Sequence, residues 1–133
     1  MRGLNSRRRF RVVARTRVVL DANALMLPFQ FSINLDAELR RLLGDCDVYV
    51  PASVVRELDR LAGRDRTAKA AFALAAKYRT HETNLSGDSA VIAVAGELGA
   101  HVVTSDKALL AALRARGIPR ITLRSQNHLV LEE

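Results

Sequence analysis

The alternation of short apolar runs with longer helical segments constrains this chain more than any other feature of its sequence. Apolar runs occur at residues 17–20, 47–50, 101–104 and 120–123. Segments with helical spacing stand between them, at residues 36–43, 53–61, 65–78, 88–97 and 107–116. Strands separated by helices predict right-handed βαβ units and a parallel sheet covered on both faces. We therefore predict an α/β fold, a three-layer α/β/α sandwich around a central parallel sheet of four or five strands.

The remaining segments show less regular patterns. Residues 28–31 (Pro-Phe-Gln-Phe) are expected to interrupt the chain between the first strand and the next helix, and Ser53 is expected to cap a helix. Residues 81–87 are polar and turn-like, with room for a very short strand, and residues 124–133 form a tail. The segment 89–95 is apolar on all sides, which predicts cover on more than one side, from the same domain or from a second subunit.

The positive charge of the chain is concentrated at one end. The net charge is +7, and the first 17 residues hold seven arginines and no acid, so the rest of the chain is neutral. We divide the chain into a basic N-terminal arm, residues 1–16, and a single domain, residues 17–133. A basic arm on a neutral body fits a polyanionic partner, the alternative being a solvated leader without a binding role.

Composition excludes several classes of protein. Aromatic residues make up 5% of the chain and Trp is absent, which argues against recognition by stacked rings. The single cysteine, Cys46, has no partner for an internal disulfide, which fits a reducing cytoplasm. No apolar run approaches the roughly 18 residues that span a bilayer, and no secretion signal is recognisable, so we expect a cytoplasmic protein without a membrane partner.

Four acidic residues stand where ligands gather in parallel sheets. Asp21 and Asp106 follow predicted strands, Asp88 opens the apolar helix, and Glu57 lies on the helix that follows the second strand. Taken singly, Asp88 and Asp106 also fit the role of helix N-cap, which contributes about 1 kcal/mol. A helical wheel places Glu57 beside the buried stripe of its helix, but Asp59 flanks the other edge as closely, so spacing alone does not choose between them.

A cluster of these acids points to a hard divalent cation. Like charges repel and raise one another's pKa, so three or four carboxylates are tolerated together mainly around a cation, and oxygen ligands suit Mg²⁺ or Mn²⁺. The three histidines lack zinc-site spacing, and the chain has no glycine-rich nucleotide loop and no Gly-x-Ser-x-Gly elbow.

Four sequence blocks together carry a family resemblance. They are VVLDANAL at residues 18–25, VPASVVREL at 50–58, GDSAVI at 87–92 and VTSDKAL at 103–109. In this order and at these separations the sequence resembles the PIN-domain nucleases, over about residues 17–123. The Asp-x-Asn after the first strand, the Phe-Gln-Phe of residues 29–31 and the Gly-Ile-Pro at 117–119 are similar to the ribosomal-RNA-processing branch of small single-domain PIN proteins.

The resemblance implies metal-dependent hydrolysis of RNA, by an endonuclease more readily than an exonuclease, with water activated by Mg²⁺ or Mn²⁺. It implies catalytic and metal-binding roles for four acids: Asp21, Glu57, Asp88 and Asp106. It implies supporting roles for three polar residues near the first and last of these acids: Asn23, Thr104 and Ser105. In many members an additional acid adjoins the third one, whereas Gly87 and Ser89 stand here, so a second ion has fewer ligands.

The resemblance also implies partners. RNA is the expected substrate, and within the arm we assign RNA contacts to Arg7, Arg8, Arg9 and Arg11. A homodimer and a ribosome-assembly or antitoxin partner are further expectations. Three alternative functions remain open at this point: a VapC-like toxin nuclease, a non-catalytic RNA-binding or assembly module, and a receiver-like phosphoacceptor domain. The receiver-like function is the weakest, because Asp21-Ala22-Asn23 supplies one acid where a receiver has a pair.

Overall fold

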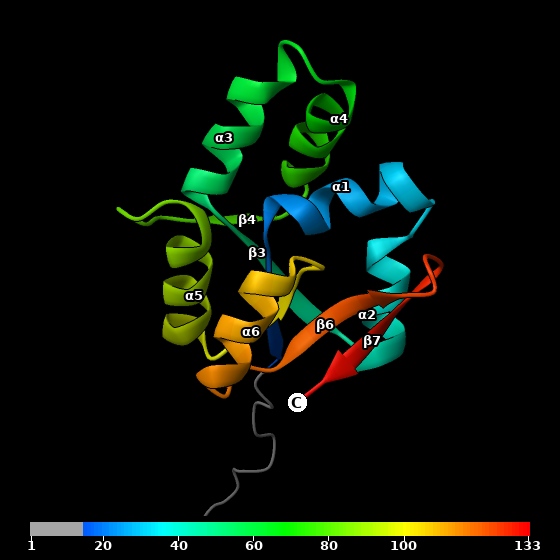
Figure 1. Cartoon of the computed structure of the whole chain (residues 1–133), viewed down its shortest axis with the longest axis vertical. Coiled ribbons are helices and arrows are strands. Elements are labelled where there is room, and N and C mark those ends of the chain that lie inside the picture. The colour runs from blue at the N-terminus through cyan, green and yellow to red at the C-terminus, as the bar shows by residue number, and fades with distance from the viewer. Residues whose placement is uncertain (1–14) are drawn as a thin grey trace, which may run out of the picture.

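A six-stranded sheet lies at the centre of the molecule (Figure 1). The structure is a computed structural model that describes residues 15–133, so the four arm arginines assigned to RNA lie outside the described residues. The strands are β2 (Thr16–Leu20), β3 (Cys46–Pro51), β4 (Arg79–His81), β5 (His101–Val103), β6 (Arg120–Arg124) and β7 (His128–Glu132). The helices are α1 (Ala22–Phe31), α2 (Leu35–Leu43), α3 (Ala52–Ala62), α4 (Arg66–Ala75), α5 (Gly87–Leu98) and α6 (Lys107–Ala115).

The strand order is β4-β3-β2-β5-β6-β7. The first five strands in this order are parallel, and β7 pairs antiparallel with β6. The prediction of an α/β fold with a parallel central sheet between helices is confirmed. The sheet is wider than the predicted four or five strands, because the residues expected to form a tail turn back and add β7 to one edge.

The strand order of the described sheet reverses direction at one point, between β2 and β5, and the space outside the carboxyl ends of these two strands is called the crevice below. From β2 the chain moves outward through β3 and β4, and then returns to β5 on the other side of β2. Ligands of such sheets bind outside the carboxyl ends of the two strands where the direction reverses, here β2 and β5. In Figure 1, α5 and α6 lie in front of the sheet and α2 behind it, while α1, α3 and α4 stand beyond the carboxyl ends.

The core is centred on β2. Val18, Val19 and Leu20 have no exposed surface, because the strand has neighbours on both sides and helices over both faces. Helix α5 buries Ala90, Val91, Val94 and Ala95, while Ile92 and Ala93 are half-buried and Ser89 and Gly96 are exposed. The helix without a polar face is therefore covered by its own domain on one side.

Local structure differs from the sequence prediction in α1 and at the start of α3. The segment 28–31 belongs to α1 rather than to a loop, although Pro28 removes one hydrogen bond of the helix. A side-chain cap from Asp21 and the burial of Leu25 and Leu27 hold this helix together. Ser53 is not a cap, because α3 begins one residue earlier after Pro51, and the Ser53 hydroxyl is buried without a hydrogen-bond partner among the described residues.

Helix α4 also ends earlier than predicted, at Ala75, and the short strand β4 begins at Arg79. Between residues 15 and 133, no helix is both long enough and apolar enough to cross a bilayer.

Candidate active site

Asp21 lies at the crevice, directly after β2. One carboxylate oxygen accepts the backbone N–H of Ala24 at 2.7 Å, which makes Asp21 the N-cap of α1. The other accepts the hydroxyl of Thr104 at 2.5 Å. Only 7% of Asp21 is exposed, and this burial raises its pKa to about 6, against the lowering effect of both hydrogen bonds. The charges of Asp106 and Asp88 raise this pKa further.

Thr104 connects two of the predicted site acids. It is fully buried at the end of β5, where its hydroxyl donates to Asp21 and accepts the backbone N–H of Asp106 at 3.1 Å. Asp106 in turn caps α6 by accepting the N–H of Leu109 at 2.9 Å. A single hydroxyl therefore connects the backbone of Asp106 to the carboxylate of Asp21, and the predicted cap role of Asp106 is confirmed.

Asn23 and Ser105 form a second link across the same edge. The side-chain oxygen of Asn23 accepts the backbone N–H of Ser105 at 2.7 Å. The Ser105 hydroxyl accepts the backbone N–H of Leu123, on β6, over a longer 3.4 Å. These contacts join the first turn of α1 to the segment that follows β5, and that segment to β6.

Asp88 lies in the exposed first turn of α5. The predicted cap role for Asp88 is wrong, because the N-cap of α5 is Ser86, which makes no side-chain cap bond. Gly87 has a φ of +59°, a conformation that favours glycine, and it turns the chain into the helix just before Asp88. Since the charge of Asp88 raises the pKa of Asp21, the two carboxylates lie within electrostatic reach.

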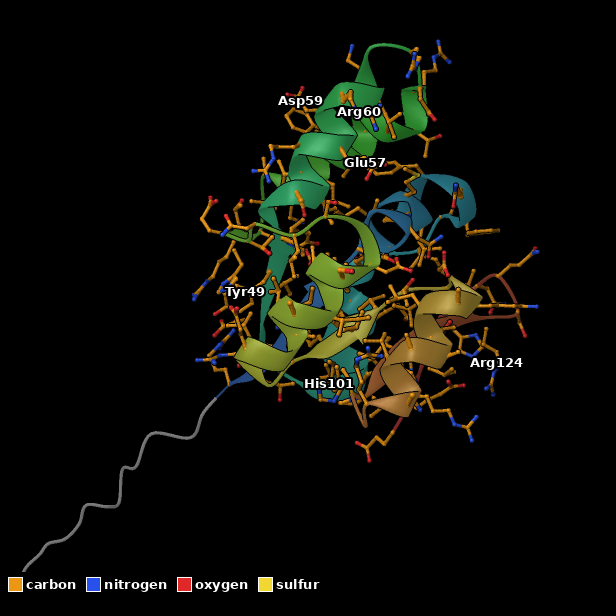
Figure 2. The ribbon with its side chains drawn as sticks, turned by 60° about the vertical axis from the view of Figure 1, so that its left-hand side comes forward. Tyr49, Glu57, Asp59, Arg60, His101 and Arg124 are labelled. Atoms are coloured by element: carbon orange, nitrogen blue, oxygen red, sulfur yellow. The ribbon has the colours of Figure 1, made fainter. Side chains whose placement is uncertain are left out.

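Glu57 stands apart from the other three acids. Its side chain is 48% exposed and lies 3.7 Å from the guanidinium of Arg60, one turn further along α3. Figure 2 shows Glu57 on the side of α3 toward α1 and Asp59 on the opposite side, so of the two candidates left open by the helical wheel only Glu57 faces α1. The charges named as raising the pKa of Asp21 are those of Asp106 and Asp88.

The donor set fits a hard cation, although the four acids do not form a closed cage. Within residues 15–133, no three or more His, Cys, Asp or Glu side chains lie close enough together to hold a metal ion. Mg²⁺, however, commonly binds through one or two carboxylates and keeps several waters. A cation near Asp21 would offset the burial of its charge, which is the largest cause of its raised pKa, and also the repulsion from Asp106 and Asp88.

A comparison with protein families decides what kind of domain this is. A family model described as a PIN like domain matches residues 18–126, which include every described site residue. The chain belongs to this family.

Relatives of this PIN-like domain agree with that assignment. It is 30% identical over 119 residues to Ribonuclease VapC9 from Archaeoglobus fulgidus, covering 86% of this chain and 87% of the relative. Among solved structures, the PIN domain endonuclease Utp24 matches with a TM-score of 0.74 and 21% identity, over 87% of this chain and 90% of Utp24. A domain of a functionally unknown protein from Methanocaldococcus jannaschii matches with a TM-score of 0.59 and 16% identity, over 83% and 92%. At these identities the two structures support the fold.

Arg60 is a neighbour of the site that the sequence motifs did not single out. The sequence did contain a signal for this contact, because Glu57 and Arg60 have opposite charges and stand three positions apart on a helix, where side chains are neighbours.

Proposed function

We propose that this PIN-like domain is a metal-dependent ribonuclease that hydrolyses RNA phosphodiester bonds. The observation that carries the proposal is the buried carboxylate of Asp21 at the crevice between β2 and β5, with a pKa raised in part by two further acids. A buried charge in this position is costly unless a cation accompanies it. The identity with a named ribonuclease supports the choice of RNA as substrate.

Asp21, Asp88 and Asp106 would hold Mg²⁺ or Mn²⁺, with Glu57 joining directly or through water. A bound divalent ion supplies Lewis acidity at a phosphoryl oxygen and lowers the pKa of water. Thr104 orients Asp21 and Asp106 through its two hydrogen bonds, and Asn23 holds the backbone of Ser105 in place.

The site recognises a phosphodiester rather than a base, so the choice of RNA sequence comes from RNA shape, the basic arm or a partner. We propose that the protein cleaves RNA internally, as an endonuclease, in ribosomal-RNA processing. We further propose that it is cytoplasmic, forms a homodimer and has a ribosome-assembly partner. A toxin nuclease with an antitoxin partner is the second candidate, favoured by the identity with VapC9. Circular RNA separates endonuclease from exonuclease cleavage, and arrest of growth on expression would favour the toxin.

The decisive test is Asp21→Asn. This change should abolish Mn²⁺-dependent cleavage of RNA while leaving RNA binding within about two-fold, because the carboxylate is buried and needed for the ion rather than for the strand. The matched control is Asp45→Asn, which removes an exposed acid just before β3, at the amino ends of the strands, and should cleave like the parent. Cleavage by the Asp21 variant at the parent's rate would refute the site assignment.

A further inference from the structure

The helical hairpin of α3 and α4 carries an excess of positive charge above the candidate site. It stands beyond the carboxyl ends of the strands (Figure 1). Its exposed basic residues are Arg56, Arg60, Arg64, Arg66 and Lys69, against the acids Glu57, Asp59 and Asp65. One of these acids, Asp65, is engaged in capping α4. A strand of RNA that reaches the crevice therefore passes a surface with a net positive charge.

Glu57 and Arg60 lie on α3, beyond the carboxyl end of β3. Helix α3 begins at the sheet edge after Pro51, and a rise of about 1.5 Å per residue puts Glu57 about 9 Å above that edge. Its carboxylate faces α1 (Figure 2) and pairs with Arg60 at 3.7 Å. Within the part of the chain that the structure describes, Glu57 is the only carboxylate that pairs with Arg60. The carboxylate of Glu57 is therefore occupied by Arg60 in this structure.

We propose that Arg60 exchanges the carboxylate of Glu57 for a phosphate of the bound RNA, and that this exchange releases Glu57 to complete the metal site. The inference rests on the proposed function and adds a positioning residue to it. In the absence of RNA, Arg60 restrains Glu57; when RNA is bound, Arg60 contacts the strand.

The exchange costs little free energy. Both partners of the pair are about half or more exposed, at 48% for Glu57 and 63% for Arg60, and such pairs contribute little to stability. A phosphate offers a guanidinium the same bidentate geometry as a carboxylate. Because Arg60 and the cation compete for Glu57, binding of RNA at Arg60 favours binding of the cation, and the reverse holds by linkage.

The experiment compares Arg60→Gln with Arg40→Gln in the full chain. Arg40, on α2, forms a matched exposed pair at 3.8 Å with Asp45, which precedes β3 at the amino ends of the strands. Its variant therefore removes the same charge without touching Glu57. Mn²⁺ binding is measured by calorimetry without RNA. Binding of a short single-stranded RNA is measured in EDTA at several salt concentrations.

We expect Arg60→Gln to bind Mn²⁺ about two- to five-fold more tightly than the parent, since Glu57 is freed from an exposed pair. Adding Glu57→Gln should remove this gain. The log–log salt slope of RNA binding should fall by about 0.7, the value for one lost phosphate contact, and Arg60→Lys should retain the slope. Arg40→Gln should change neither quantity.

An unchanged Mn²⁺ affinity or an unchanged salt slope in Arg60→Gln would overturn the exchange. If Asp21→Asn abolishes cleavage while Arg60→Gln behaves like Arg40→Gln, this inference fails and the proposed function stands. If the parent does not cleave RNA with Mn²⁺, the proposed function itself fails.

Discussion

At the scale of single residues, Asp21 combines two roles that have different requirements. As an N-cap it needs only an oxygen that accepts the N–H of Ala24, and this contact begins α1. As a carboxylate, it has a raised pKa, because burial and the charges of Asp106 and Asp88 disfavour its ionised form. The capping oxygen survives in asparagine, whereas the charge does not, so one substitution separates the two roles.

The charge of Asp21 should therefore destabilise the metal-free protein at neutral pH. Its pKa rises from 3.8 to about 6 on folding, which corresponds to about 3 kcal/mol at about 1.4 kcal/mol per pKa unit. Because the folded state binds the proton more tightly, its stability decreases as the pH rises from 4 to 6. Asp21→Asn in EDTA should raise the free energy of unfolding at pH 8 by up to about 3 kcal/mol, and the gain should shrink toward pH 4. Urea denaturation across this pH range measures it, and a gain independent of pH would show that the buried charge is not its cause.

At the scale of elements, the hairpin of β6 and β7 closes one edge of the sheet. The backbone N–H and C=O of Leu129 both point outward, where Glu38 accepts at 2.8 Å and Arg41 donates at 2.7 Å. Glu38 and Arg41 also pair with each other at 2.8 Å. Side chains of α2 thus occupy edge positions that would otherwise be open to another strand.

The turn of this hairpin contains two strained residues. Ser125 and Gln126 have φ values of 55° and 59°, which residues other than glycine rarely adopt. The backbone N–H of Asn127 donates to the carbonyl of Arg124 at 3.3 Å and closes the turn. Gln126→Gly should raise the free energy of unfolding by about 0.5–1 kcal/mol by relieving this strain. Lys69→Gly, in the exposed middle of α4, should lower it by about 1 kcal/mol. Thermal denaturation compares the two, and a loss of stability in Gln126→Gly would exclude strain at this turn.

At the scale of the whole molecule, positive charge is distributed unevenly along the chain. The described domain is close to neutral and carries the acids, whereas the arginine excess belongs to the arm. The described part of the chain begins with Arg15, which pairs with Asp47 at 2.8 Å, and β2 starts at Thr16. A truncation that tests the arm should therefore end at residue 14 and leave β2 intact.

Removal of residues 1–14 should flatten the salt dependence of RNA binding. Five arginines are lost, so the log–log slope should fall by up to about 3.5, at about 0.7 for each phosphate contact to a single strand. Fluorescence anisotropy at several salt concentrations gives the slope. A full-length variant with Gln at Arg7, Arg8, Arg9 and Arg11 controls for shortening the chain. An unchanged slope in both proteins would leave the arm without a role in RNA binding.

Much of the architecture can be predicted from the local sequence. Apolar runs such as 17–20 and 101–104 predict buried strands because such side chains need cover on both faces, and glycines such as Gly44 and Gly99 predict where helices end. The place of Asp21 and Asp106 after their strands follows from the same reasoning. Strand β7 was missed because its edge is satisfied by Glu38 and Arg41 from α2, contacts about ninety residues apart in sequence.

The sequence by itself determined the class of fold, the strands at whose ends the acids stand and the uneven charge, since these depend on side-chain type and on spacing along the chain. Tertiary structure alone decided which acids share an electrostatic environment. Asp106 lies within electrostatic reach of Asp21 because β2 and β5 are neighbours in the sheet, and the first turn of α5 brings Asp88 within reach of Asp21 as well. Glu57, in contrast, lies on α3 and pairs with Arg60. Charge interactions depend on separation in space, and that separation exists only once the strand order is set.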